Sequence, residues 1–155
     1  MSVYQQHRID EIQRLFEENQ DLFNTKKPEM VKNKAKGISK VVATLPLNDH
    51  PEYGETILNI SETVDDKGNI ESYHYGWELS QRVKKRSKQE RHLTAFGNED
   101  HSGPPMFEPD PYHHHQFPHQ PAQRKHTNVQ DLETVVEILK NYIVGGLTYD
   151  QLHKF

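Results

Sequence analysis

The chain has 155 residues, of which 32% are hydrophobic, with 19 Lys and Arg against 23 Asp and Glu, 11 His and no Cys. This length and composition predict one domain with a small core. The absence of cysteine excludes a disulfide framework, an iron–sulfur cluster, a thiolate zinc site and a cysteine nucleophile. No apolar run reaches the roughly 18 residues of a membrane span, and no signal-peptide pattern begins the chain, so we expect a cytoplasmic protein without a membrane partner.

The first part of the chain predicts a helix followed by a basic connection. Apolar residues recur at three- and four-residue steps through residues 1–24, and Ser2 is a candidate N-cap. This pattern predicts an amphipathic helix that packs one face on the core. Residues 25–40 are rich in lysine and are interrupted by Pro28 and Gly37. They predict a connection rather than a long helix.

Residues 41–97 predict a β-meander. Four stretches rich in β-branched and aromatic residues have the length and alternation of strands, and Ile57 and Ile60 are expected core residues among them. The predicted strands cover residues 39–47, 55–64, 70–79 and 91–97. Gly68 lies between the second and third stretches, in the run 65–69, and can supply the positive φ of a hairpin turn.

The third predicted strand separates aromatic residues from a histidine. Because side chains alternate along a strand, Tyr73, Tyr75 and Trp77 share one face. We expect these rings in the core rather than on a stacking platform, since a chain with few aliphatic residues needs their large apolar surface. His74 falls on the other face, together with Ser72 and Gly76.

The last part of the chain combines a biased segment with a helix. Residues 98–127 are rich in Pro and His and predict a long loop, either functional or disordered. Residues 128–155 predict a helix and a tail, with Asn128 as N-cap and Gly145–Gly146 as the stop. The apolar stripe of that helix consists of Leu132, Val135, Val136, Leu139 and Ile143. The whole pattern predicts an α+β domain: an N-terminal helix, about four mostly antiparallel strands, a long His/Pro-rich loop and a C-terminal helix.

Positive charge is concentrated in two segments. Residues 25–40 hold six lysines against one acid, and residues 82–91 hold six Lys and Arg against one acid. The two segments sum to +10, which leaves −14 for the remaining residues, given the net charge of −4. Clustered cations in an otherwise acidic chain favour a polyanionic partner such as RNA, although a solvated loop has the same pattern. The candidate nucleic-acid contacts are Lys32, Lys34, Lys36, Arg82, Lys84, Lys85, Arg86, Lys88 and Arg91.

Seven of the eleven histidines lie between residues 92 and 126, and three chemistries fit them. A divalent metal could be held by His113 and His115 with an acidic residue among Glu99, Asp100 and Asp110, although the spacing matches no standard signature. Paired imidazoles could instead cleave a phosphodiester without a cofactor, with His74 and His114 as the first choice. The third reading is structural, in which the rings only pack or hydrogen-bond. We expect no cofactor, with the metal as the alternative.

Three motifs together resemble a known family. The runs SYHYGWE at 72–78, DPYHHHQFPHQ at 110–120 and NVQDLETVVEIL at 128–139 resemble the TumE-like toxin family of bacterial and archaeal toxin–antitoxin systems, over roughly residues 40–143. The resemblance implies a small cytoplasmic protein encoded beside a cognate antitoxin and acting on nucleic acid. The positions that it carries over are Tyr73, His74, Tyr75, His113, His114 and His115. The chain departs from the family at AFGNEDH, where the family has an arginine-tyrosine-aspartate-asparagine run, and in its long N-terminal helix.

Segregated cations and clustered imidazoles lead to one main hypothesis. We expect a toxin-like protein that binds RNA through the two basic segments and acts as a metal-independent endoribonuclease through histidine acid–base chemistry. The alternatives are a non-catalytic module, which binds nucleic acid or docks on a protein as an inhibitor, and a metal-dependent hydrolase.

Overall fold

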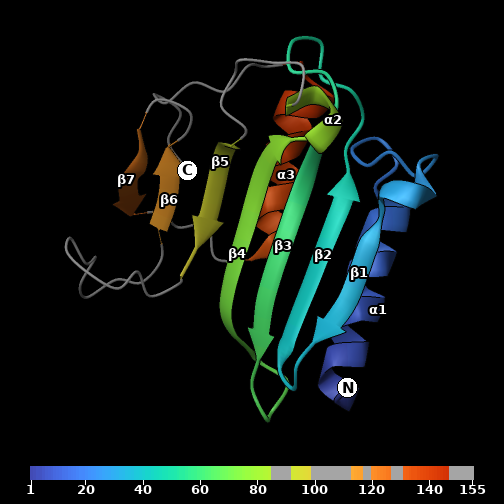
Figure 1. Ribbon diagram of the computed structural model, residues 1–155, viewed down its shortest axis with the longest axis vertical. Coiled ribbons are helices and arrows are strands. Elements are labelled where there is room, and N and C mark those ends of the chain that lie inside the picture. The colour runs from blue at the N-terminus through green and yellow to red at the C-terminus, as the bar shows by residue number, and fades with distance from the viewer. Residues whose placement is uncertain (85–91, 99–112, 117–119, 127–130, 147–155) are drawn as a thin grey trace.

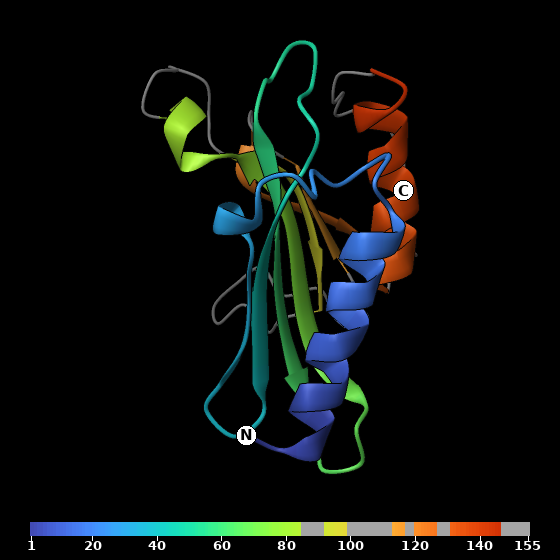
Figure 2. The same ribbon diagram turned by 90° about the vertical axis from the view of Figure 1, so that its right-hand side faces the viewer.

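The computed structural model describes residues 1–84, 92–98, 113–116, 120–126 and 131–146. It has the predicted α+β class: helices α1 and α3 cover one face of an antiparallel sheet whose strands follow chain order (Figures 1 and 2). The helical elements are α1 (Val3–Glu18), η1 (Pro28–Met30), α2 (Gln81–Lys84) and α3 (Leu132–Ile143). The strands are β1 (Lys32–Lys36), β2 (Lys40–Pro46), β3 (Thr56–Val64), β4 (Ile70–Leu79), β5 (His92–Gly97), β6 (His113–Gln116) and β7 (Gln120–His126).

Helix α1 begins as predicted and ends early. The Ser2 side chain accepts a hydrogen bond from the Gln5 backbone N–H at 3.1 Å, and the Gln5 side chain accepts one from the Ser2 backbone at 2.8 Å, which forms a capping box. The prediction of a helix to residue 24 was wrong, because the chain leaves the helix at Asn19. This exit turns Leu22 and Phe23 into the core, where both are almost fully buried.

The basic connection contains a strand that the sequence analysis missed. Residues 32–36 form β1 and pair with β2 through a hairpin in which Gly37 has φ 65°. The alternation Lys-Asn-Lys-Ala-Lys leaves the three lysines exposed and half-buries Asn33 and Ala35. The Asn33 amide donates to the Ile9 carbonyl of α1 at 2.9 Å, which ties this strand to the helix. The segment has few apolar residues, so its sequence did not predict a strand. The strand forms because it pairs with β2 and contacts α1.

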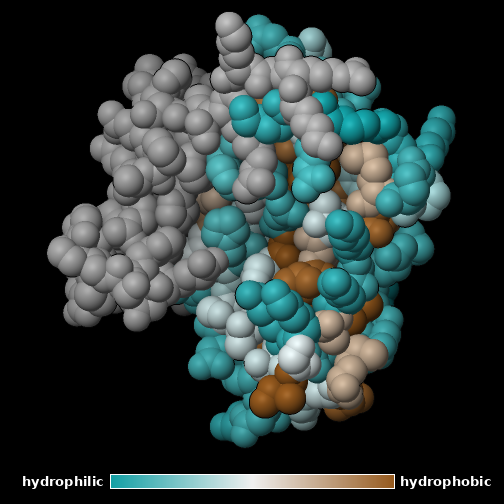
Figure 3. Space-filling model, viewed as in Figure 1, coloured by the Kyte–Doolittle hydropathy of each residue, from teal (hydrophilic) through white to brown (hydrophobic). Residues whose placement is uncertain are grey.

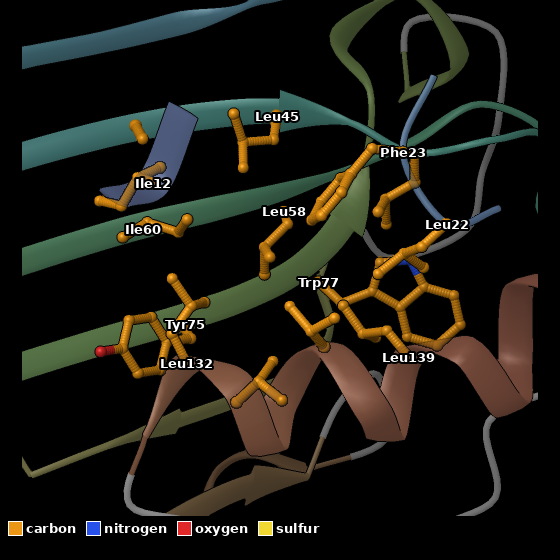
Figure 4. Packing of buried hydrophobic residues seen from close by; sticks show 14 of the residues in the cluster. Ile12, Leu22, Phe23, Leu45, Leu58, Ile60, Tyr75, Trp77, Leu132 and Leu139 are labelled. Carbon is orange, nitrogen blue, oxygen red and sulfur yellow. The ribbon is translucent and has the colours of Figure 1, made fainter. Parts of the chain in front are cut away.

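Strands β2 to β5 confirm the predicted meander, and the core lies between them and the two long helices. Figure 4 shows Tyr75 and Trp77 of β4 lying over Leu132 and Leu139 of α3. Tyr73, Tyr75 and Trp77 are all at least 96% buried, so the expectation that this aromatic face is core is confirmed. The hairpin at Gly68, with φ 87°, is also confirmed.

Both expected core residues of β3 are buried, but on opposite faces of the sheet. Ile60 is 2% exposed and lies on the helix-covered face of the sheet, as does Leu58 two residues earlier. Ile57 is also buried, but it is an odd number of residues away and therefore lies on the opposite face of the sheet. Two isoleucines three residues apart in a strand cannot share a face.

The C-terminal part differs from the sequence prediction in two places. Helix α3 has Asp131 as its N-cap, whose carboxylate accepts from the Thr134 N–H at 2.7 Å, whereas the predicted cap Asn128 lies outside the described residues. The apolar stripe of this helix is buried as expected. The segment 98–127 is not a loop throughout, because β6 and β7 continue the sheet beyond β5. Within the described residues, no helix is long and apolar enough to cross a membrane.

Candidate functional site on the helix-free face of the sheet

The sheet has one face that α1 and α3 do not cover, and we call it the open face. Figure 1 looks onto this face, and Figure 2 shows η1 and α2 on its side of the sheet, opposite the long helices. Its described part is mainly hydrophilic, with a few apolar groups near the middle (Figure 3). The open face carries Lys32, Lys34, Lys36, Lys40, Thr44, Asn59, His74 and Glu78, with His92 at its β5 side.

The lysines of β1 belong to the open face by register. Lys32, Lys34 and Lys36 pair with Thr44, Val42 and Lys40 of β2. The intervening β2 residues, Val41, Ala43 and Leu45, are buried in the core, so the paired residues lie on the other face. All four lysines of this hairpin are exposed. Three of the predicted nucleic-acid contacts therefore lie together, on a regular strand.

A single row of paired residues, which we call the register row, runs across the sheet from β1, the lysine strand, to the histidines. Lys34, Val42, Ser61, His74, Gly97, His113 and His126 occupy successive paired positions across all seven strands. His74 and His113 are therefore two strands apart, or about 10 Å between Cα atoms. Gly97, which has no side chain, lies between them.

The register does not bring together the pair chosen from the sequence. His114 pairs with Phe96 of β5, and Phe96 pairs with the core residue Tyr75 of β4. His114 therefore belongs to a register row next to that of His74. His115 pairs with Ala95, which pairs with Gly76, so it belongs to the register row of Gly76. Residue His113 thus shares the row of His74, and His114 does not.

Two glycines leave room for the His74 ring to lie against the sheet. A Cβ atom added at Gly76 would lie 3.3 Å from the imidazole Cε1, and one added at Gly97 would lie 3.8 Å from its Cδ2. The ring therefore leans along β4 over Gly76 and beside Gly97. The imidazole is half-buried, so the sheet orients it without removing it from the surface. This agrees with the predicted placement of His74 opposite the aromatic residues.

A polar network that the sequence analysis missed crosses the open face at the other end of β4. The Thr44 hydroxyl donates to Asn59 Oδ1 at 2.8 Å, and the Asn59 amide donates to Glu78 Oε1. The other carboxylate oxygen, Oε2, lies 3.0 Å from His92 Nδ1. Glu78 is only 5% exposed, and it borders a pocket of about 360 Å³. The pocket is also lined by Met30, Lys32, Thr44, Ile57, Asn59 and Arg82.

An ion-pair cluster around Glu55 borders this pocket. Lys27 Nζ and an Arg82 guanidinium nitrogen each lie 2.6 Å from Glu55 Oε2. Burial by itself would raise the pKa of Glu55, but the hydrogen bonds from Arg82 and Lys27 outweigh burial and lower the pKa to about 2. Arg82, a predicted nucleic-acid contact, is therefore engaged with a carboxylate, although its side chain is 67% exposed.

Two of the site residues carried over from the family lie in the core instead. The Tyr75 hydroxyl donates to Glu62 Oε2 at 2.6 Å, and Tyr73 stacks on Tyr75 with a centroid separation of 4.9 Å. Burial and the adjacent Glu62 raise the pKa of Tyr75. Arg8 of α1 binds both Glu62 oxygens, at 2.6 and 2.9 Å. Tyr73 and Tyr75 are thus structural residues on the helix-covered face, away from His74.

The remaining predicted residues fall at or beyond the end of α2. Lys84 is half-buried in the last position of α2. Lys85, Arg86, Lys88 and Arg91 lie outside the described residues. The same holds for the acidic partners in the metal alternative, Glu99, Asp100 and Asp110. Among the side chains that the structure describes, no three histidine, aspartate or glutamate residues come together as a metal site.

Part of the missed network was visible in the sequence. Glu78 follows His74 and Gly76 at two-residue steps, so strand alternation already places it on the face of His74. The contribution of Asn59 and His92 depends on strand register, which the sequence did not give. Comparisons with protein-family models, curated proteins and solved structures found no match to this chain.

Proposed function

We propose that this chain is a toxin-like protein that binds RNA on the open face and cleaves it with histidine acid–base chemistry, as its resemblance to the TumE-like family suggests. The observation that supports this proposal best is the register row that runs from Lys34 through His74 to His113. A strand of exposed lysines attracts a phosphate backbone, and imidazoles in the same row can act on it.

The geometry suggests a division of roles in the cleavage step. His74 removes the proton from a ribose 2′-hydroxyl, and the 2′-oxygen forms a bond to phosphorus. The bond from phosphorus to the 5′-oxygen breaks, and His113 in its protonated form gives that oxygen a proton. The products are a 2′,3′-cyclic phosphate and a 5′-hydroxyl, so the step needs no redox partner. We choose His113 rather than His114 because of its register with His74.

Salt dependence of binding tests the role of the lysine strand. Each phosphate contact that is lost should reduce the slope of log K against log salt for single-stranded RNA by about 0.7. We expect the double variant Lys34→Gln/Lys36→Gln to reduce the slope by about 1.4. Arg14→Gln/Lys67→Gln removes two exposed cations outside the open face and is the matched control. Equal slopes for the two double variants would contradict binding on the open face.

Cleavage of labelled RNA tests the chemistry. We expect cleavage to survive EDTA and to fall at least a hundredfold in His74→Ala and in His113→Ala, since a general acid or base contributes about 10²–10⁴. Cleavage that returns only with a divalent metal would give the histidines a ligand role instead. Steep salt-dependent binding without turnover would favour the non-catalytic binding module. Capture of an antitoxin without RNA affinity would favour the protein-docking module.

A further inference from the structure

The pocket beside Glu78 has the features of a ligand site that the cleavage chemistry does not use. The pocket is lined by Glu78, whose side chain is 93% buried. Asn59 and His92 each contact one of its carboxylate oxygens and so orient it. Thr44 in turn holds the Asn59 amide at 2.8 Å, which fixes the direction in which that amide donates. Such a chain of hydrogen bonds holds the carboxylate in one position.

The wall and the rim of the pocket differ in character from its floor. Ile57 and Met30 supply apolar surface at its side. Lys32 is exposed at the rim, and Lys27, Glu55 and Arg82 together carry one net positive charge. A ligand that fits has a flat, partly apolar body with hydrogen-bond donors at one end and a negative group at the other. A nucleotide has this distribution.

We infer that this pocket binds one nucleotide of the RNA, with its base on Glu78 and its phosphate near Lys32, and that it favours bases that carry an exocyclic amino group. This inference rests on the proposed function, because the pocket opens on the face where the RNA is proposed to lie. It adds base selection, which neither the lysine strand nor the histidines provide.

The base preference follows from the acceptor character of a carboxylate. An ionised glutamate only accepts hydrogen bonds, and its two oxygens have about four acceptor sites, part of which Asn59 and His92 occupy. Adenine, cytosine and guanine each present an amino group that donates on the pairing edge, whereas uracil presents there a single N3–H donor between two carbonyl acceptors. A carbonyl oxygen that faces the Glu78 carboxylate is repelled, so uracil is disfavoured.

Binding of mononucleotides by calorimetry tests the inference without requiring cleavage. We expect the wild-type chain to bind AMP, GMP and CMP at least fivefold tighter than UMP, which corresponds to one good hydrogen-bonded base contact. Glu78→Gln should reduce that preference to less than twofold, because an amide can also donate to uracil. Glu133→Gln, an exposed acid on α3, is the matched control and should leave the preference unchanged.

A second variant keeps the test valid if Glu78→Gln fails to fold. Lys32 is exposed, so Lys32→Gln should fold normally and weaken all four nucleotides by a similar factor of at least three. The inference is overturned if no mononucleotide binds, if UMP binds as well as the others, or if the preference persists in folded Glu78→Gln. Normal salt slopes in the lysine-strand experiment would then show that RNA binding survives without the nucleotide pocket.

Discussion

The two faces of the sheet each bury a glutamate, and the partners of the two residues differ. On the helix-covered face, Glu62 is 1% exposed and is held by Arg8 and Tyr75. On the open face, Glu78 is 5% exposed and is held by Asn59 and His92. Guanidinium keeps its charge at any accessible pH, whereas imidazole gains or loses its charge near neutrality.

This difference separates a structural carboxylate from a candidate ligand-binding one. Burial tends to lower the pKa of Arg8, but the hydrogen bond and the charge of Glu62 outweigh it and raise the pKa above the ordinary value. The ion pair between Arg8 and Glu62 joins α1 to β3, and the Glu62 carboxylate is buried between these two elements. Glu78 is held by an amide and an imidazole, and it borders a pocket on the face without long helices. Depth of burial alone would not have distinguished the two residues.

The largest effect should come from breaking the pair on the helix-covered face. Arg8→Met leaves Glu62 buried without its counter-charge, so we expect the free energy of unfolding to fall by about 3–5 kcal/mol. Urea denaturation measures this change. Arg14→Met, on the exposed side of the same helix, should change it by less than about 0.5 kcal/mol. A loss below about 1 kcal/mol in Arg8→Met would mean that Glu62 finds another partner or reaches water.

Two glycines on the open face should respond differently to the same change. A Cβ at Gly97 would lie 2.9 Å from the Tyr73 carbonyl oxygen, so Gly97→Ala must displace backbone and should cost about 1–3 kcal/mol. A Cβ at Gly76 would be close to the His74 ring and in ordinary contact with the Ala95 Cβ at 4.0 Å, so Gly76→Ala should cost less than about 1 kcal/mol while it tilts the imidazole and slows RNA cleavage several-fold. Unchanged cleavage in Gly76→Ala would contradict the proposed role for the orientation of His74.

The smallest effect is the acid sensitivity of the cluster at the end of the pocket. The pKa of Glu55 is lowered from 4.5 to about 2, so its ion pairs stabilise the fold above about pH 4.5, and this contribution is lost as the pH falls toward 2. We expect Glu55→Gln to be about 1–2 kcal/mol less stable than wild type at pH 7, with the difference shrinking below pH 4.5. Urea midpoints at pH 7, 4 and 3 measure it. A constant difference would assign the effect to packing.

Local patterns predicted the parts of this molecule that depend on local chemistry. The Ser2 cap, the Gly68 turn, the aromatic face of β4 and the stripe of α3 follow from residue type and periodicity. The strand β1 could not be predicted in this way, because three of its five residues are lysines and it depends on the hairpin with β2 and on α1.

The candidate site was predicted only as far as strand alternation reaches. His74 was placed on the correct face because its neighbours are aromatic core residues. The sequence could not show that His113 rather than His114 is in register with His74, since alignment across β5 depends on hydrogen bonds between distant segments. The Glu78 network joins four strands, and strand alternation predicts only the face of Glu78, because the contacts of Asn59 and His92 depend on register.

Protection of lysines from acylation by bound RNA tests the central claim, that RNA occupies the open face, most directly. Wild-type chain is labelled with and without single-stranded RNA at low salt, and each lysine is quantified by mass spectrometry. We predict at least threefold protection of Lys34, Lys36 and Lys40, and none of Lys67 or Lys140, which lie outside that face. Protection spread equally over all five lysines, or confined to Lys67 and Lys140, would contradict binding on the open face.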